Sequence, residues 1–207
     1  MNTGIILGLL PLASYAFVMS ITPGPNNLLL ASSGLRFGFA KSIPLWLGIN
    51  AGFIALLILC SMGIGALITK VPIVALGLKV FGTLYLLSLA WSIRSNAFEV
   101  GEADEADEVK AGKPIGFIAA AIFQCVNPKA WVMTLSASAA FIPDLEPYWL
   151  ATTVFVSTFI LVGMPCGGAW LLAGASLKRV LNAPFWRAVS VWIMPLLIVA
   201  SAIGIWL

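Results

Sequence analysis

Two apolar stretches of this 207-residue chain are too long for a single membrane crossing, and each is interrupted inside its length. The first covers residues 1–35 and is broken by the segment 22–27. The second covers residues 114–143 and is broken by the segment 127–129. A helix crosses the hydrocarbon core in about 20 residues. A break frees backbone N–H and C=O groups that lipid cannot satisfy, so it must lie against protein or a cavity. The two breaks therefore indicate a polar site enclosed by helices.

The composition is that of a membrane protein. Charged residues make up 9% of the chain and hydrophobic residues 61%, whereas charged residues make up about 25% of a typical soluble domain. The fold class that we predict is an all-α integral membrane protein with six transmembrane helices, of which the first and fourth are broken. The predicted helices cover residues 5–21, 42–66, 73–93, 115–138, 148–172 and 188–206.

A hydrophilic segment at residues 95–113 divides the chain into two parts with three predicted helices each. It holds six of the eight acidic residues, and so dense a run of like charge is usually a solvated loop. An odd number of spans forces the two parts into opposite orientations. We therefore predict that residues 1–94 and 114–207 are inverted three-helix repeats of one transporter domain, residues 1–207.

Basic residues are concentrated after the first, third and fifth predicted helices. Eight of them follow these helices, while the opposite side has Lys70 together with the acidic Asp144 and Glu146. Loops rich in Lys and Arg stay in the cytoplasm. Both termini are therefore expected on the periplasmic side. The eight residues are Arg36, Lys41, Arg94, Lys110, Lys113, Lys178, Arg179 and Arg187.

The predicted spans contain no Asp, Glu or His, which excludes intramembrane proteolysis by an Asp pair or by a His-bound zinc. We expect no enzyme activity, no catalytic residue, no metal and no cofactor. Cys60, Cys125 and Cys166 lie in apolar segments and are interpreted as small buried hydrophobic residues. Because the basic residues are scattered at span ends, we expect no binding of nucleic acid.

Lys129 is the most informative single residue of the second break. A lysine in the middle of a span costs about 2.5–3.5 kcal/mol on insertion scales, and no acid is available in the spans to pair with it. One interpretation is that Lys129 reaches the interface or bonds to carbonyls freed by Pro128. The other is that it faces a polar cavity and attracts the carboxylate of a substrate.

The first break has an equally direct interpretation. Pro23 and Pro25 stop the helix and lack backbone donors, while Asn26 and Asn27 bring amide groups that both donate and accept. Residues 28–35 are expected to restart as a short helix whose N-terminus favours an anionic group. The alternative is a helix-ending turn at the membrane interface.

Further polar residues complete the candidate substrate-binding set. Gln124 precedes Asn127 by three residues and shares its helix face, and Asn50 and Tyr85 are polar residues of the second and third spans. Each of these could equally be a packing contact. The candidates are Thr22, Pro23, Gly24, Pro25, Asn26, Asn27, Asn50, Tyr85, Gln124, Asn127 and Lys129.

Three predicted spans each carry a pair of glycines spaced by four residues: Gly4 with Gly8, Gly48 with Gly52, and Gly163 with Gly167. Small residues at this spacing allow membrane helices to approach closely. We expect these pairs to serve helix packing rather than contact with a ligand.

The motifs resemble those of the LysE/RhtB superfamily of bacterial amino-acid exporters. The resemblance rests on Thr22-Pro23-Gly24-Pro25-Asn26, on residues 127–130 (Asn-Pro-Lys-Ala) and on residues 79–86 (Lys-Val-Phe-Gly-Thr-Leu-Tyr-Leu). It covers nearly the whole chain. With Asn27 and the pair Ser32-Ser33, the first motif is most similar to that of the cysteine and O-acetylserine exporters.

The resemblance implies a multi-pass protein of the bacterial inner membrane that exports small neutral amino acids or derivatives by alternating access. Cysteine, O-acetylserine, threonine and homoserine are the expected substrates, because a cationic amino acid would need acids in the spans. The alternatives are export of another amino-acid class, or a membrane scaffold or assembly protein without a polar cavity. The expected partners are the amino-acid substrate and membrane lipid, and a homodimer is left open.

Overall fold

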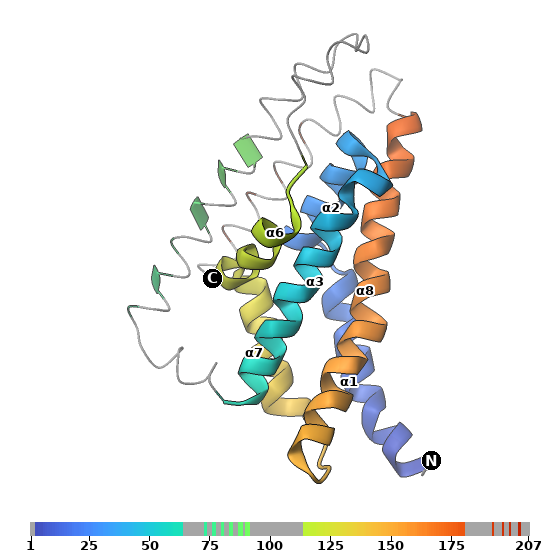
Figure 1. The fold of residues 1–207 in the computed structure, drawn as a ribbon, viewed down its shortest axis with the longest axis vertical. Helices are drawn as coiled ribbons and strands as arrows, with labels where there is room; N and C mark the ends of the chain where they lie inside the picture. The colour runs from blue at the N-terminus through green and yellow to red at the C-terminus, as the bar shows by residue number, and fades with distance from the viewer. Residues whose placement is uncertain are drawn as a thin grey trace.

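The structure, a computed structural model, describes residues 3–63 and 114–180, together with isolated positions within 73–91 and 192–203. The described segments are helical and contain no strand. Figure 1 shows their arrangement as a bundle of long, roughly aligned helices. The elements are α1 (Thr3–Ile21), α2 (Pro25–Phe37), α3 (Phe39–Ser61), α6 (Phe117–Phe123), the 3-10 turn η2 (Gln124–Val126), α7 (Pro128–Phe141) and α8 (Tyr148–Val180).

Both predicted breaks interrupt helices in the structure. α1 ends at Ile21, and α2 begins at Pro25, three residues before the predicted restart. Proline suits this position, because the first residues of a helix have no intrahelical partner for their N–H groups. The predicted fourth span is divided into α6, η2 and α7, with the extended residue Asn127 (φ −84°, ψ 105°) immediately before α7.

The second and fifth predicted spans are continuous helices, α3 and α8. Both are long and apolar enough to cross a membrane. Within the described part of the chain, α1 and the α6–η2 segment form shorter apolar helices, as expected for spans that are broken. The predicted spans 73–93 and 188–206, apart from isolated positions, and the predicted loop 95–113 lie outside the described residues.

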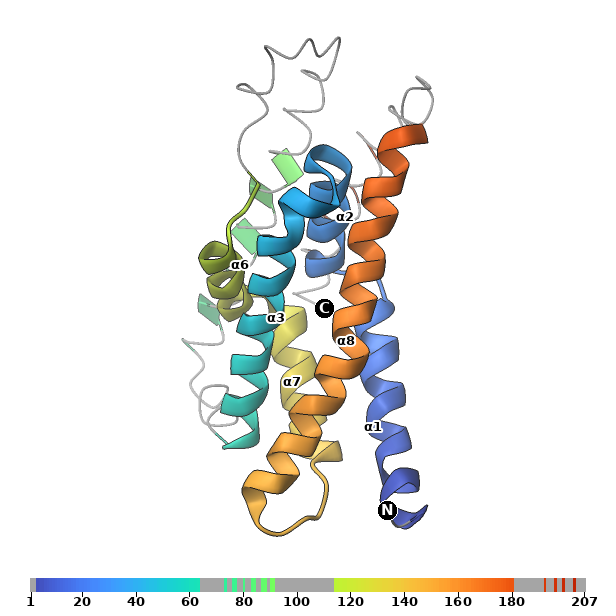
Figure 2. The same cartoon turned by 45° about the vertical axis from the view of Figure 1, so that its right-hand side comes forward.

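The helices are held together at two close crossings that depend on glycine. α8 packs along α2 and α1, while α3 packs along α6 and α7, as Figures 1 and 2 show. A methyl group at Gly48 would lie 2.2 Å from the carbonyl oxygen of Phe117, and one at Gly52 would lie 2.3 Å from that of Ala121. The packing role predicted for this pair is therefore confirmed.

The crossing of α2 and α8 uses a second pair of glycines. A methyl group at Gly34 would lie 2.3 Å from the carbonyl oxygen of Leu171, and one at Gly174 would lie 2.0 Å from that of Ala31. Such distances leave no room for a side chain. Glycine therefore permits the helix backbones to touch at both crossings.

Two buried apolar clusters divide the bundle along its length. One contains Leu45 of α3 and Leu171 of α8, together with the leucines of α2. The other contains Leu57 of α3 and Phe155 of α8, together with residues of α1 and α7. The first break separates α1 in one cluster from α2 in the other, and the second break separates α7 from α6 in the same way. Because α3 and α8 run through both clusters, the middle parts of these two helices lie at the level of the breaks.

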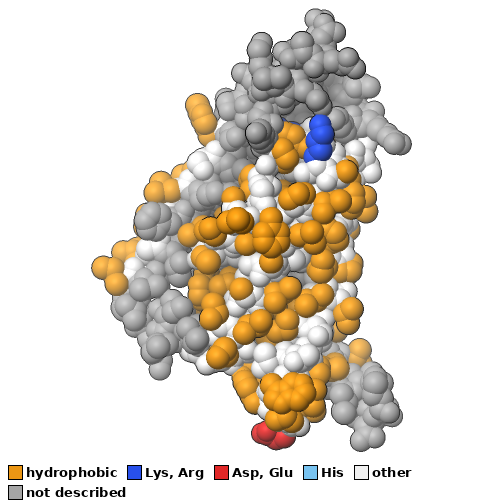
Figure 3. All heavy atoms as spheres, in the orientation of Figure 1, with side chains coloured by type: hydrophobic (Ala, Val, Ile, Leu, Met, Phe, Trp, Pro, Cys, Tyr) orange, Lys and Arg blue, Asp and Glu red, His pale blue; other side chains and the backbone are white. Residues whose placement is uncertain are grey.

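The outer surface is suited to lipid. Hydrophobic side chains cover the face seen in Figure 3, and charged side chains lie toward its ends. Ile118 and Leu161 are 72% and 75% exposed, and a large continuous apolar surface of this kind marks contact with a membrane or a partner. Asp144 and Glu146 lie in the α7–α8 connection, at the opposite end of the bundle from the α2–α3 corner in Figure 1.

Candidate functional site

The carbonyl groups of Met19, Ser20 and Ile21 at the end of α1, and that of Thr22, accept hydrogen bonds from side chains. The last carbonyls of a helix have no intrahelical partner, and leaving them unpaired inside a membrane is costly. Thr22 Oγ1 donates to the carbonyl of Met19 at 3.1 Å, and Trp170 Nε1 donates to that of Ile21 at 3.0 Å. Asn27 Nδ2 donates to the carbonyls of Ser20 and Thr22 at 2.7 and 2.8 Å. Specific side-chain hydrogen bonds therefore fix the conformation of the break.

Lys129, in the first turn of α7, completes the same set of contacts from the other break. Its Nζ donates to the carbonyl and to Oγ1 of Thr22, both at 3.0 Å, and to the carbonyl of Pro23 at 3.2 Å. An ammonium group has three N–H donors, so these three acceptors match its capacity. Lys129 does bond to freed carbonyls, but they belong to the α1–α2 break and not to Pro128.

Three amide side chains form a hydrogen-bonded cluster between the breaks. Asn26 and Gln124 exchange two hydrogen bonds, of 2.9 and 3.0 Å. Asn127 Nδ2 donates to Oδ1 of Asn26 at 2.9 Å and to Oε1 of Gln124 at 3.3 Å. Asn127 is 1% exposed and Gln124 is fully buried. The cluster joins α2 to η2 and α7 across about a hundred residues of sequence.

One acceptor of this cluster has no partner among the described residues. Oδ1 of Asn127 is buried and accepts no hydrogen bond from residues 3–63 or 114–180. A buried polar atom without a partner loses about 1–3 kcal/mol relative to one that is satisfied. Such an atom is the natural contact for a donor group on a bound molecule.

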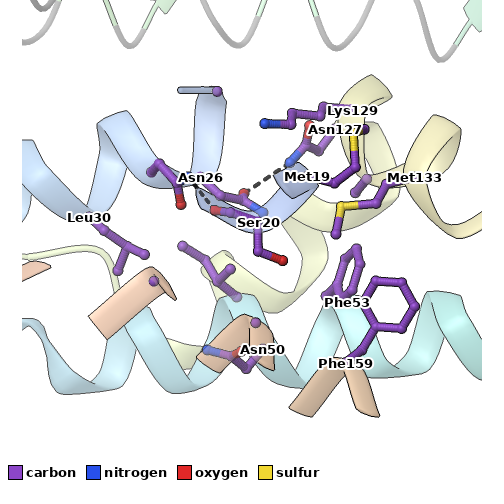
Figure 4. A pocket seen from close by; sticks show the side chains of 16 residues that line it. Met19, Ser20, Asn26, Leu30, Asn50, Phe53, Asn127, Lys129, Met133 and Phe159 are labelled. Carbon is purple, nitrogen blue, oxygen red and sulfur yellow. Dashed lines mark hydrogen bonds between the residues drawn. The ribbon is translucent and has the colours of Figure 1, made fainter. Parts of the chain in front are cut away.

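A cavity of about 70 Å³ lies where the two breaks meet α3 and α8. Figure 4 shows Lys129 and Asn127 on one side of it and Asn50 and Phe159 on the other. This volume is several times the roughly 10–15 Å³ that a single water requires, so it fits a small solute. The lining residues are Met19, Ser20, Gly24, Asn26, Asn27, Leu30, Ile49, Asn50, Phe53, Asn127, Lys129, Ala130, Met133, Phe159, Gly163 and Gly167.

The predicted site residues are distributed around this cavity in two ways. Those that line it are Gly24, Asn26, Asn27, Asn50, Asn127 and Lys129. Thr22 and Pro23 instead accept hydrogen bonds from Lys129, and Gln124 supports Asn26. Pro25 begins α2 without lining the cavity, and Tyr85 lies outside the described residues.

Sequence reasoning missed the apolar part of the lining. Met19, Phe53, Met133 and Phe159 come from four different helices and converge in Figure 4. Apolar residues of a membrane span give the same sequence signal whether they face lipid, protein or a cavity. Ser20, which precedes the first break by two residues, is a polar residue that the sequence could have added to the predicted substrate-binding set.

Two expectations need correction. Gly163 and Gly167 line the cavity, and the atoms nearest to a methyl group at either position belong to side chains and not to a helix backbone. Cys60 and Cys166 are buried as predicted, but Cys125 is exposed, because it lies in the tight turn η2, whose neighbouring residue Gln124 occupies the interior. Among the residues described, no three His, Cys, Asp or Glu side chains gather where they could hold a metal ion.

Comparison with known proteins identifies the family. Three similar proteins, from Salmonella choleraesuis, Klebsiella pneumoniae and Escherichia coli, are each named cysteine/O-acetylserine efflux protein. Their identities to this chain are 30%, 28% and 30%, over 93% of this chain and 94%, 93% and 94% of their own lengths. No solved structure matches the chain significantly. The profile of the LysE type translocator family matches residues 17–204, which confirms the resemblance seen in the motifs. This helical membrane protein therefore belongs to the LysE type translocator family.

Proposed function

We propose that this protein exports small amino acids with uncharged side chains, or their derivatives, across the bacterial inner membrane. The observation that carries the proposal is the cavity at the meeting point of the two breaks. Its lining holds one charged group, Lys129, beside the amides of Asn26 and Asn127, and no acid among the described residues. Breaks at matching points of two halves are typical of a transporter's substrate site.

The chemistry of the lining suits a zwitterion. The carboxylate of the substrate would approach Nζ of Lys129 and replace part of its bonding to Thr22 and Pro23. The ammonium group would donate to the unpartnered Oδ1 of Asn127. A charge-assisted hydrogen bond of this kind is stronger than one between neutral groups.

The same lining disfavours cationic amino acids. A second positive charge on the substrate would lie close to Lys129, and no carboxylate among the lining residues would balance it. Like charges at short range repel strongly in surroundings of low dielectric constant. Cysteine, O-acetylserine, threonine and homoserine remain the proposed substrates, and the names of the similar proteins support the first two.

The proposal includes six transmembrane helices in two inverted repeats, residues 1–94 and 114–207, which alternate access to the cavity. In support, each half contains one broken span, in α1–α2 and in α6–α7, and the two breaks are hydrogen-bonded to each other. The alternative of a scaffold without cargo predicts a solid bundle, which the polar cavity does not favour.

Counterflow in liposomes would test the function. Purified protein is reconstituted into liposomes that are loaded with unlabelled amino acid, and the uptake of labelled amino acid from outside is measured. We expect exchange of at least one of cysteine, O-acetylserine, threonine and homoserine above the level of protein-free liposomes, and none of lysine. Exchange of lysine at an equal rate would contradict the proposed substrate class, and absence of all exchange would contradict transport.

A further inference from the structure

Six glycines of the described helices fall into two classes by the atoms that lie nearest to an added methyl group. At Gly34, Gly48, Gly52 and Gly174 it would lie within 2.0–2.3 Å of a backbone oxygen. Backbone atoms cannot move aside individually, so these positions require glycine for packing. At Gly163 and Gly167 the nearest atoms belong to side chains, at 3.2 Å or more. Because side chains can shift by a few tenths of an ångström, close approach of helix backbones does not require glycine at these two positions.

The second class lies at the cavity. Gly163 and Gly167 are one helical turn apart on α8, and both line the cavity. A methyl group at Gly163 would approach Oγ of Ser20 at 3.2 Å. One at Gly167 would approach Nε1 of Trp46 at 3.2 Å and Cδ1 of Leu30 at 3.3 Å. Ser20 and Leu30 also line the cavity, so a methyl group on either glycine would enter the lining and take up part of the cavity volume.

An independent feature favours this space as a binding site. Asn127 lines the cavity, is 1% exposed, and carries the unpartnered Oδ1. Asn127 and Lys129 lie on the opposite side of the cavity from Phe159, the α8 residue labelled in Figure 4. A substrate held at Lys129 and Asn127 by its carboxylate and ammonium groups would therefore extend its side chain toward α8.

We infer that Gly163 and Gly167 are specificity-determining residues, which fix the largest substrate side chain that the cavity admits. The inference rests on the proposed function. In a cavity of about 70 Å³, one added methyl group is a large change. One methylene group in a tight pocket changes discrimination between substrates by about 10- to 200-fold.

The test measures a ratio of two substrates in the counterflow assay. In Gly163→Ala and in Gly167→Ala, exchange of O-acetylserine relative to cysteine should fall by about tenfold or more. O-acetylserine carries the larger side chain, so it is excluded first. Exchange of cysteine should stay within a few-fold of the wild type. Thermal unfolding in detergent checks that each variant is folded.

Gly168→Ala is the matched control on the same helix. A methyl group there would lie 3.4–3.9 Å from atoms of the Trp46 ring, an ordinary contact, and Gly168 does not line the cavity. The ratio of the two substrates should be unchanged in this variant. If Gly163→Ala unfolds, the ratio in Gly167→Ala decides the test. The double variant Gly163→Ala with Ser20→Ala removes the oxygen that the methyl group meets and returns space to the cavity, so its ratio should move back toward that of the wild type.

The possible outcomes separate this inference from the proposed function. An unchanged ratio in folded Gly163→Ala and Gly167→Ala, with the wild type active, would overturn the inference and leave the function standing. An equal loss of both substrates, or the same change in Gly168→Ala, would also overturn it. A wild-type protein that exchanges neither amino acid would overturn the proposed function, and the inference with it.

Discussion

The side chain of Lys129 lies directly across Gly24. A methyl group at Gly24 would lie 2.7 Å from Cδ of Lys129 and 3.0 Å from Nζ. The backbone of Gly24 is extended (φ −178°, ψ 176°), a conformation open to any residue. Glycine is therefore required here for space and not for backbone conformation: the first break leaves room for a lysine that comes from the second.

This contact predicts a coupling between the two positions. Gly24→Ala should lower the free energy of unfolding by about 1–3 kcal/mol, the usual cost of overpacking, because Lys129 must leave its three acceptors. In a Lys129→Ala background the same change should cost much less, since the obstructing atoms are gone. Unfolding in detergent, measured for the wild type and the three variants, gives the coupling energy.

Gly116→Ala is the control for that cycle. Gly116 precedes α6 with φ −77°, and nothing lies within 4 Å of an added methyl group, so its stability should equal that of the wild type. An equal cost of Gly24→Ala in both backgrounds would show that the glycine serves something other than Lys129.

Lys129→Met should abolish export while the protein stays inserted and folded. The change removes the one charge that the described residues contribute to the cavity lining and relieves the insertion cost of about 2.5–3.5 kcal/mol. This gain in stability is opposed by the loss of the hydrogen bond to the carbonyl of Pro23. The carbonyl of Thr22 still accepts a hydrogen bond from Asn27. We therefore expect little net change in stability.

Lys129→Arg should also impair export, because a planar guanidinium does not replace a compact ammonium among three converging oxygens. Efflux of cysteine, O-acetylserine and threonine from preloaded cells, with membrane levels checked by immunoblot, measures both variants. Normal efflux of every transported substrate by Lys129→Met would leave Lys129 with a structural role only.

Asn26→Ala should destabilise the protein more than Asn50→Ala. Oδ1 of Asn26 accepts from both Gln124 and Asn127, and Gln124 is fully buried. Truncating Asn26 weakens the pairing of both partners, and a buried group left unpaired costs about 1–3 kcal/mol. Within the described part of the chain, the amide of Asn50 donates only to the carbonyl of Trp46 in its own helix. Equal midpoints of denaturation for the two variants would contradict a cooperative cluster.

The polar features of the site could be predicted from the sequence because each is conspicuous in an apolar span. Pro23, Asn26, Asn127 and Lys129 interrupt otherwise uncharged segments, and the membrane makes every such interruption costly. Their pairing could not be predicted. The partners of Lys129 are 106 and 107 residues away, and nothing local to either segment determines which break supplies acceptors to the other.

The roles of the glycines and of the apolar residues also could not be predicted from the sequence. Gly48 and Gly163 give identical sequence signals, yet one touches the backbone of α6 and the other lines the cavity. The difference depends on which face of each helix meets its neighbour, a property of the whole bundle. The same holds for Phe159, which a span could equally present to lipid.

The orientation of the protein in the membrane is the last prediction. Fusions to reporters that are active on one side only should place residue Asp104 in the cytoplasm and the C-terminal Leu207 in the periplasm. The reason is the distribution of Lys and Arg, eight on one side against one on the other in the predicted topology. The described helices agree with this charge distribution: Arg36 and Lys41 flank the α2–α3 corner, while the opposite end bears Asp144 and Glu146.

Fusions at the α7–α8 connection, near Asp144, provide an internal control and should report the periplasm. Cytoplasmic activity at Leu207 together with periplasmic activity at Asp144 would mean that an odd number of spans, and not the predicted two, follows the α7–α8 connection, and that the second half is not an inverted copy of the first.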